Sequence, residues 1–210
     1  MQIAIVLYPG FTALDVVGPY EVLARLPGAE VVFVAERPGL VRNDLGSLSI
    51  DAVAGLDEVT RPDVVVIGGG PGQANQMSDG PLHSWLRSAD THTTWTMSVC
   101  TGSLILAAAG LLRGRRATTH WRALEQLTQF GASPSEDRVV VDGNYLIGAG
   151  VSAGIDAALT LAGKIAGDAT AQAVQLLIEY DPRPPYSAGS TSTAPASVIR
   201  EAEDMLTSRR

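Results

Sequence analysis

Apolar runs alternate with segments of helical spacing along most of the chain. Residues 3–8 form a continuous apolar run, which is typical of a strand buried on both faces, and residues 15–26 then repeat apolar side chains at helical spacing. Similar segments predict further strands at 30–35, 63–67 and 95–99, and helices at 83–89, 102–112 and 121–130. This alternation predicts an α/β fold with a doubly wound, mostly parallel sheet and helices on both faces.

The second half of the chain adds different patterns. We predict a short strand at 117–120, and a hairpin in which 138–141 and 145–148 flank the turn Asp142-Gly143-Asn144. Helical spacing returns at 155–166 and 170–179. Residues 181–195 are rich in Pro, Gly, Ser and Thr, which predicts an extended tail, and 196–208 have the pattern of a short amphipathic helix. We therefore expect one domain over 1–210, with the tail and short helix at 181–210.

Composition narrows the classes of function. The chain has 210 residues, of which 46% are apolar, and this is enough for one full hydrophobic core. A net charge of -7 and a pI near 4.9 argue against nucleic-acid or membrane partners, because phosphate binding needs clustered Lys and Arg. No secretion signal or membrane-spanning run is visible, and a single cysteine cannot form an intramolecular disulfide. We expect a cytoplasmic protein.

The single cysteine, Cys100, lies where the predicted strand at 95–99 meets the helix that follows. A tight strand-to-helix turn lifts its central side chain out of the sheet and directs the first amides of the helix toward it. The positive end of the helix dipole then favours a thiolate, which predicts a lowered pKa and a nucleophilic sulfur. The alternative interpretation is that Cys100 is a small buried apolar residue.

A glycine-rich turn follows the predicted strand at 63–67. Its residues, 68–72, should open at the carboxyl edge of the sheet, where ligands bind in open α/β folds. We predict that the amides of Gly69 and Gly70 act as oxyanion donors or bind substrate. The alternative is a turn that only needs flexible backbone. The first strand is not followed by a GxGxxG pattern, so a dinucleotide cofactor is not expected.

Asp15 follows the first strand and is expected at the same edge of the sheet. It is the candidate acid or base, while the alternative is a helix N-cap, a position where Asp is favoured. Glu21 competes for the acid role, but its place inside the helix makes it the weaker choice. His83 and His92 stand in polar surroundings and are predicted at the surface.

Several motifs together resemble the ThiJ/PfpI superfamily, which has a flavodoxin-like, class I glutamine amidotransferase-like fold. They are Leu14-Asp15-x-x-Gly18-Pro19-x-Glu21-Val22-Leu23, the glycine-rich turn, Ser98-Val99-Cys100-Thr101-Gly102-Ser103 and Ala117-Thr118-Thr119-His120-Trp121. Further stretches at 153–156, 175–180 and 184–190 resemble the isocyanide (isonitrile) hydratases. The chain departs from the superfamily pattern at Gly68, where these turns commonly carry proline.

The resemblance implies a lyase that adds water to an isonitrile and gives an N-substituted formamide. It implies no metal or organic cofactor, and a homodimer. By matched motif, Cys100 is the nucleophile that forms a covalent thioimidate, Asp15 is the acid and base, and Thr101 helps to hold Asp15 or the thiolate. His120 is a candidate for direct catalytic work or for a structural position.

Other functions share parts of this pattern. The main alternative is another thiol-dependent hydrolase or a glyoxalase-like enzyme of the same superfamily. Glyoxalase-type relatives place Glu after the first strand and His beside the cysteine, where this chain has Asp15 and Thr101. Transcription regulators with a C-terminal helix-turn-helix module also carry these motifs, but we expect no room for such a module here. A redox-sensing module is a further alternative, because an exposed cysteine of low pKa oxidises readily.

Overall fold

The computed structural model describes residues 1–207. The chain divides into two units, one of Met1–Ile178 and a second that begins at Glu179. Each unit is described here by itself, and the prediction of a single domain over the whole chain stays a prediction.

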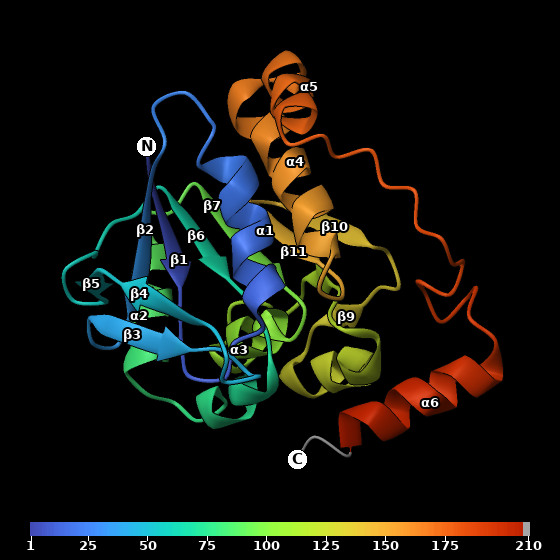
Figure 1. Ribbon diagram of the computed structural model, residues 1–210. Helices are drawn as coiled ribbons and strands as arrows, with labels where there is room; N and C mark the ends of the chain where they lie inside the picture. Colours follow the sequence, from blue (N-terminus) through green and yellow to red (C-terminus); the bar gives the residue numbers. More distant parts are fainter. Residues whose placement is uncertain (208–210) are drawn as a thin grey trace. The chain divides into compact units, whose positions relative to one another are not determined.

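The first unit is built on a seven-stranded sheet (Figure 1). All neighbouring strands are parallel except β10 and β11, which form the predicted antiparallel hairpin. In spatial order the strands are β10 (Val139–Asp142), β11 (Tyr145–Gly148), β7 (Trp95–Val99), β6 (Val64–Ile67), β1 (Gln2–Val6), β2 (Glu30–Ala35) and β5 (Ala54–Gly55). The prediction of a mostly parallel, doubly wound sheet is confirmed.

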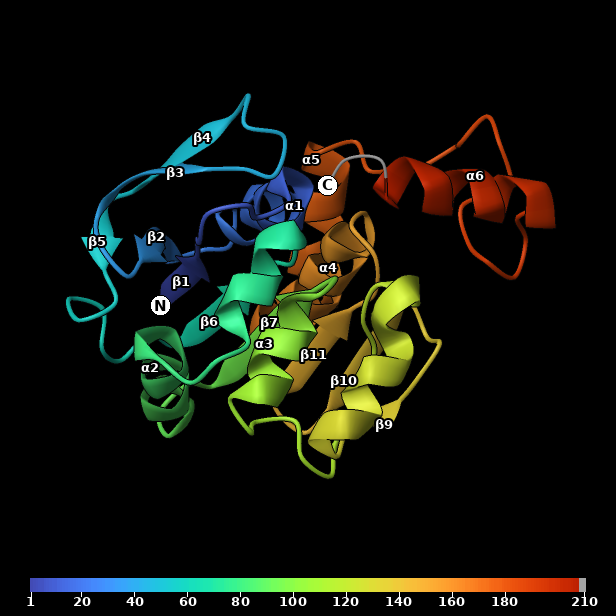
Figure 2. The same ribbon diagram turned by 90° about the horizontal axis from the view of Figure 1, so that it is seen from below.

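Helices cover both faces of this sheet, which explains why β6 is a continuous apolar run and β1 is apolar after its first residue. Every residue of β6 is buried, for example. Figure 2 shows α1 and α4 on one face and α2 and α3 on the other. Helix α5 packs on α4, and the 3-10 helix η2 packs on α3. The helices of this unit are α1 (Ala13–Leu23), α2 (Pro81–Asp90), α3 (Gly102–Ala108), η2 (Trp121–Phe130), α4 (Ala153–Ala166) and α5 (Asp168–Leu177).

The register of the three central strands brings their carboxyl ends together. Val6 of β1 pairs with Ile67 of β6, and Ile67 in turn pairs with Ser98 of β7. The chain therefore leaves all three strands at one edge of the sheet. The segments before α1, after β6 and before α3 meet there, and these segments carry the candidate site residues.

Short elements complete the unit. The antiparallel ribbon of β3 (Gly39–Arg42) and β4 (Ser49–Ala52), and the 3-10 helix η1 (Pro71–Gln76) after the glycine-rich turn, were not predicted. β8 (Arg116–Ala117) pairs with β9 (Ser133–Pro134) and includes only the first residue of the strand predicted at 117–120. These strands are short and mostly exposed, so they show little hydrophobic periodicity. The predicted helix 102–112 ends early, at Ala108, and Gly110 adopts a left-handed φ of 87° two residues later.

The second unit contains an irregular segment followed by one helix. Residues 181–195 form turns and extended backbone, and α6 (Ala196–Thr207) follows them. Ser208, the predicted end of this helix, lies outside the described residues. None of the helices within residues 1–207 is both long and apolar enough to cross a membrane.

Gly102, the first residue of α3, fits against β6 with no space for a side chain. A Cβ atom there would lie 2.4 Å from the carbonyl oxygen of Ile67. We expect Gly102→Ala to lower the free energy of unfolding by about 2 kcal/mol or more, because backbone must shift to accept the methyl group. Gly80→Ala is the control, since the nearest atom to its Cβ would be 3.8 Å away. Equal urea midpoints for the two variants would contradict this close packing.

Candidate active site

Cys100 occupies a strained turn between β7 and α3. Its φ is 57°, and Cys100 and Glu179 are the two non-glycine residues with positive φ within 1–207. A left-handed backbone costs an L-residue about 1–2 kcal/mol, so the surrounding structure must hold it. We call residues 99–102 the elbow.

Hydrogen bonds fix the elbow from two sides. The Cys100 amide donates to the carbonyl oxygens of Gly148 (3.1 Å) and Ala149 (2.7 Å). The Cys100 carbonyl accepts bonds from the hydroxyls of Thr119 (2.9 Å) and Ser103 (3.1 Å). These contacts oppose the strain and fix the direction in which the thiol points.

Asp15 is fully buried beside this elbow. It is the third residue of α1, whose N-cap is Thr12, so the alternative of a helix N-cap is wrong. Its Oδ2 accepts the Gly69 amide at 2.7 Å, whereas its Oδ1 has no hydrogen-bond partner among the described residues. Burial raises the pKa of Asp15 to about 7, against the opposing effects of the Gly69 amide and the Cys100 thiol.

The structure brings Cys100 and Asp15 together, and we call them the Cys100–Asp15 pair. Burial, and then the negative charge of Asp15, raise the pKa of the Cys100 thiol. The amides of Thr101 and Val151 face the sulfur and lower this pKa, but by less. Cys100 is only 5% exposed. The predicted lowering of the pKa by the helix dipole is therefore wrong for the resting chain, because burial and Asp15 favour the protonated thiol.

The glycine-rich turn serves this pair differently from the prediction. The Gly69 amide is bonded to Asp15, and the Gly70 amide donates to the Thr101 hydroxyl at 3.0 Å. Both predicted oxyanion donors are thus already engaged by side chains. The Thr101 hydroxyl accepts a hydrogen bond from the glycine-rich turn and does not hold Asp15. The Thr101 amide faces the sulfur.

His120 caps the 3-10 helix η2. Its Nδ1 accepts the Arg122 amide at 3.4 Å, and its ring packs against Trp121. The ring also lies near Gly150, in the loop that carries the Val151 amide. Burial, and then Arg122, lower the pKa of His120, which keeps it neutral near pH 7. These contacts favour the structural role predicted for His120 over a role as a partner of the Cys100 thiol.

Comparison with known proteins places this arrangement in a family. Residues 1–165 match the model of the DJ-1/PfpI family. The chain belongs to the DJ-1/PfpI family. A curated isonitrile hydratase from Pseudomonas putida is 45% identical over 202 residues, which cover 96% of this chain and 88% of that protein.

Two further similar proteins were found, one of them a solved structure that supports the fold. The crystal structure of a ThiJ/PfpI family protein from Pseudomonas syringae superposes with a TM-score of 0.94 at 39% identity, over 99% of this chain and 86% of that one. The HTH-type transcriptional regulator CdhR of Pseudomonas aeruginosa is 30% identical over 164 residues, which are 74% of this chain but 48% of the regulator.

Other titratable residues lie outside the pair. His83 was predicted at the surface but is buried, with its Nε2 2.7 Å from the carbonyl oxygen of Gln76. His92 is exposed as predicted. Glu21 forms an ion pair with Arg25 at 2.6 Å, and it is not among the groups that shift the pKa of Asp15 or Cys100. Within residues 1–207, no cluster of three or more His, Cys, Asp and Glu is arranged to hold a metal ion.

Two residues at the site were missed by sequence reasoning. Tyr8 is buried beside the pair and interacts electrostatically with both members, and Val151 contributes its amide to the sulfur. A tyrosine that ends an otherwise aliphatic strand is a usable signal for Tyr8, because a buried hydroxyl needs a partner. Val151 acts through its backbone, which carries no sequence signal.

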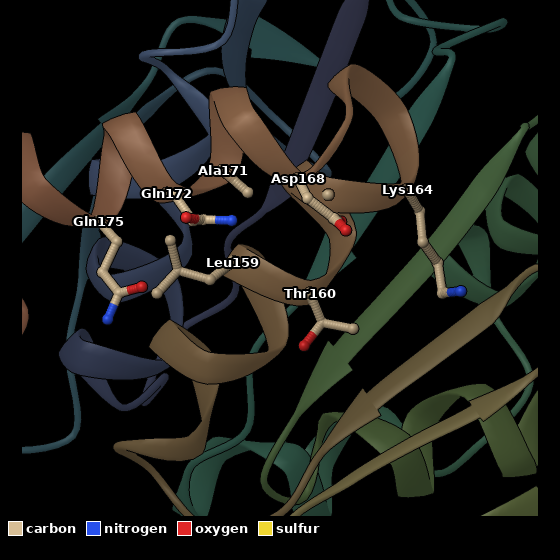
Figure 3. A pocket seen from close by; sticks show the side chains of 8 residues that line it. Leu159, Thr160, Lys164, Asp168, Ala171, Gln172 and Gln175 are labelled. Carbon is tan, nitrogen blue, oxygen red and sulfur yellow. The ribbon is translucent and has the colours of Figure 1, made fainter.

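Two cavities lie away from the sulfur. Figure 3 shows one of about 400 Å³ between α4 and α5, lined among others by Thr160, Lys164 and Asp168. A second, of about 420 Å³, lies at the carboxyl ends of β1 and β2 and includes Tyr8 in its wall. Neither is lined by Cys100 or Asp15, so neither is the place of the predicted chemistry.

The buried Asp15 should make stability depend on pH in a defined direction. The pKa of Asp15 is about 7 in the folded chain, against 3.8 for an ordinary Asp carboxyl. Its favourable contribution to the free energy of unfolding is therefore fully present below pH 4 and is lost as the pH rises through 7. Asp15→Asn removes this loss. We expect the free energy of unfolding of the variant, relative to that of the native chain, to rise by about 2–4 kcal/mol between pH 4 and pH 8, as measured by urea unfolding. Parallel pH curves for the two proteins would contradict a buried carboxyl of raised pKa.

Two substitutions distinguish a capping role of His120 from a catalytic one. His120→Asn retains a side-chain acceptor for the Arg122 amide, so we expect turnover of the enzyme's substrate within about threefold of the native value. His120→Ala should lower the free energy of unfolding by about 1 kcal/mol. A loss of turnover of about 100-fold or more in His120→Asn, with unchanged stability, would show direct acid-base work instead.

Proposed function

We propose that this chain is an isonitrile hydratase, which adds water to an isonitrile and releases an N-substituted formamide. The observation that carries the proposal is the buried Cys100–Asp15 pair at the elbow. It lies in a chain that is 45% identical, over 96% of its length, to a curated isonitrile hydratase.

The first half of the proposed reaction forms a covalent intermediate. The Cys100 proton passes to Asp15 as the sulfur attacks the terminal carbon of the isonitrile, and an S–C bond forms. Asp15 then delivers this proton to the same carbon, which gives a thioimidate with a new C–H bond. The amides of Thr101 and Val151 support the sulfur while it carries negative charge.

The second half consumes water. Asp15 takes a proton from water as the oxygen attacks the thioimidate carbon, and the electron pair of the C=N bond moves to nitrogen, which accepts that proton from Asp15. The C–S bond then breaks, the hydroxyl proton returns to sulfur through Asp15, and the N-substituted formamide leaves. The balance is one isonitrile and one water for one formamide, and the thiol and carboxylate are restored.

The pKa of Asp15 suits this task. A group that must accept and then release a proton works best when its pKa is near the working pH, and burial raises the pKa of Asp15 to about 7. The same burial keeps Cys100 protonated until substrate arrives. The proposed route needs no metal or organic cofactor, because thiol, carboxylate and water supply every proton and bond.

Three further properties belong to the proposal. Cys100 as nucleophile and Asp15 as acid and base are supported by their contact. A homodimer and a cytoplasmic location are part of the proposal because the chain resembles the isonitrile hydratases.

Formamide production from an alkyl or aryl isonitrile tests the function directly. We expect Cys100→Ser to lose at least about 10³-fold in kcat/KM, and Asp15→Asn about 10²–10⁴-fold. Glu21→Gln, a matched change on the same helix α1, should retain activity because Glu21 is paired with Arg25. Below about pH 7 the native kcat/KM should fall tenfold per unit, since protonated Asp15 cannot accept the thiol proton.

Several results would contradict the proposal. A native protein that forms no formamide, or a Cys100→Ser variant that forms it at the native rate, excludes it. Methylglyoxal serves as the parallel substrate, and its consumption in the absence of isonitrile turnover would favour the glyoxalase-like alternative.

A further inference from the structure

Tyr8 is the group next to the pair that the proposed mechanism does not use. It lies just after β1, it is only 3% exposed, and its hydroxyl donates to the carbonyl oxygen of Gly68 at 2.8 Å. Burial, and then the negative charge of Asp15, raise the pKa of Tyr8 well above its usual value. Its hydroxyl therefore remains a donor over the whole working pH range.

The acceptor of this hydroxyl belongs to the same peptide group that holds Asp15. The Gly68 carbonyl and the Gly69 amide are the two ends of one planar peptide, and the Gly69 amide donates to Oδ2 of Asp15 at 2.7 Å. A donor at the carbonyl end polarises a peptide and strengthens its amide as a donor. The Tyr8 hydroxyl and the Asp15 carboxyl are thus linked in series through one peptide.

Packing keeps this peptide in place. A Cβ at Gly68 would lie 2.8 Å from Cβ of Asp15, and one at Gly69 would lie 2.4 Å from the amide nitrogen of Thr101. Both glycines therefore pass through gaps that only a hydrogen atom fits. The peptide touches α1 on one side and the elbow on the other, so its orientation fixes the direction of the Gly69 amide.

We infer that Tyr8 is a positioning residue, which acts through the Gly68–Gly69 peptide to hold Asp15 and to favour its ionised form. Tyr8 does not touch the reacting atoms. The inference rests on the proposed function only for its catalytic meaning, because the link between Tyr8 and Asp15 is a property of the fold.

Other charges act on Asp15 and set the sign of the test. Asp44, from the loop between β3 and β4, raises the pKa of Asp15, whereas Cys100 and the Gly69 amide lower it. Asp44 is held by the Thr12 hydroxyl and the Leu45 amide, which do not involve Tyr8. Removing the Tyr8 hydroxyl therefore weakens one of the influences that favour the carboxylate and leaves Asp44 in place.

Infrared titration of the Asp15 carboxyl measures this effect without any substrate. The carbonyl band of the protonated acid is assigned by its loss in Asp15→Asn, and its midpoint is then followed with pH. We expect Tyr8→Phe to raise this midpoint by about 0.5 pH unit, which corresponds to about a threefold change in proton affinity. The acid limb of kcat/KM for formamide production should move by the same amount.

Tyr145→Phe is the matched control. Tyr145 is also a buried tyrosine, and its hydroxyl donates a hydrogen bond to Asp90. It is the first residue of β11, at the end of the sheet opposite to the carboxyl ends of the strands. It should leave the Asp15 midpoint unchanged. If Tyr8→Phe does not fold, 3-fluorotyrosine at position 8 replaces it. Its more acidic hydroxyl is a stronger donor, and we expect the midpoint to fall.

The outcomes separate this inference from the proposed function. An unchanged or lowered midpoint in Tyr8→Phe, an equal shift in Tyr145→Phe, or a raised midpoint with 3-fluorotyrosine would overturn the inference. A raised midpoint in a protein that does not turn over isonitriles would support the role of Tyr8 while excluding the function. Native turnover of isonitriles, with an acid limb of kcat/KM that does not move in Tyr8→Phe, would support the proposed function and exclude the role of Tyr8.

Discussion

The candidate site depends on a carboxyl group that is kept away from water with a single strong hydrogen bond. A buried carboxylate normally needs several donors, and Asp15 accepts one amide, that of Gly69, besides its interaction with the Cys100 thiol. Burial raises its pKa to about 7, and its Oδ1 has no hydrogen-bond partner within residues 1–207. In the proposed function, the free energy lost in burying Asp15 gives a carboxyl group that can exchange a proton with the neighbouring thiol.

The rest of the unit supplies rigidity around this group. The parallel register brings three loops to one edge, and each loop contributes a different piece: α1 brings the acid, the turn after β6 brings its donor, and the elbow brings the sulfur. Backbone contacts from Gly148 and Ala149 hold the strained elbow against the neighbouring strand β11. A site assembled from backbone in this way tolerates little movement, because each support is also a part of the sheet edge.

Sequence patterns predicted the frame well because it depends on burial. The apolar runs of β1, β2 and β6, and the turn at Asp142-Gly143-Asn144, have strong local signals. The meeting of Asp15 and Cys100 was also predictable, since both follow parallel strands. The antiparallel ribbon was not, because β3 and β4 are short and mostly exposed. The helix 102–112 was predicted too long, since small residues continue past its true end at Ala108.

The electrostatics of the site could not be predicted in the same way. The helix dipole suggested a thiolate, but the sequence does not show that the sulfur is 5% exposed or that a buried acid lies beside it. The uses of the Gly69 and Gly70 amides depend on which side chains approach them, and these come from residues far away in sequence. His83 illustrates the same limit, because its polar neighbours in sequence do not reveal that its ring is buried.

The sharing of one proton by the Cys100–Asp15 pair also bears on selectivity. With the acid ionised, the pair carries one negative charge, and moving the proton from sulfur to oxygen leaves that total unchanged. An uncharged molecule can therefore react without adding to the charge held in the interior. An anion would place a second negative charge there, and a cation would lose its hydration, so the proposed reaction favours neutral substrates.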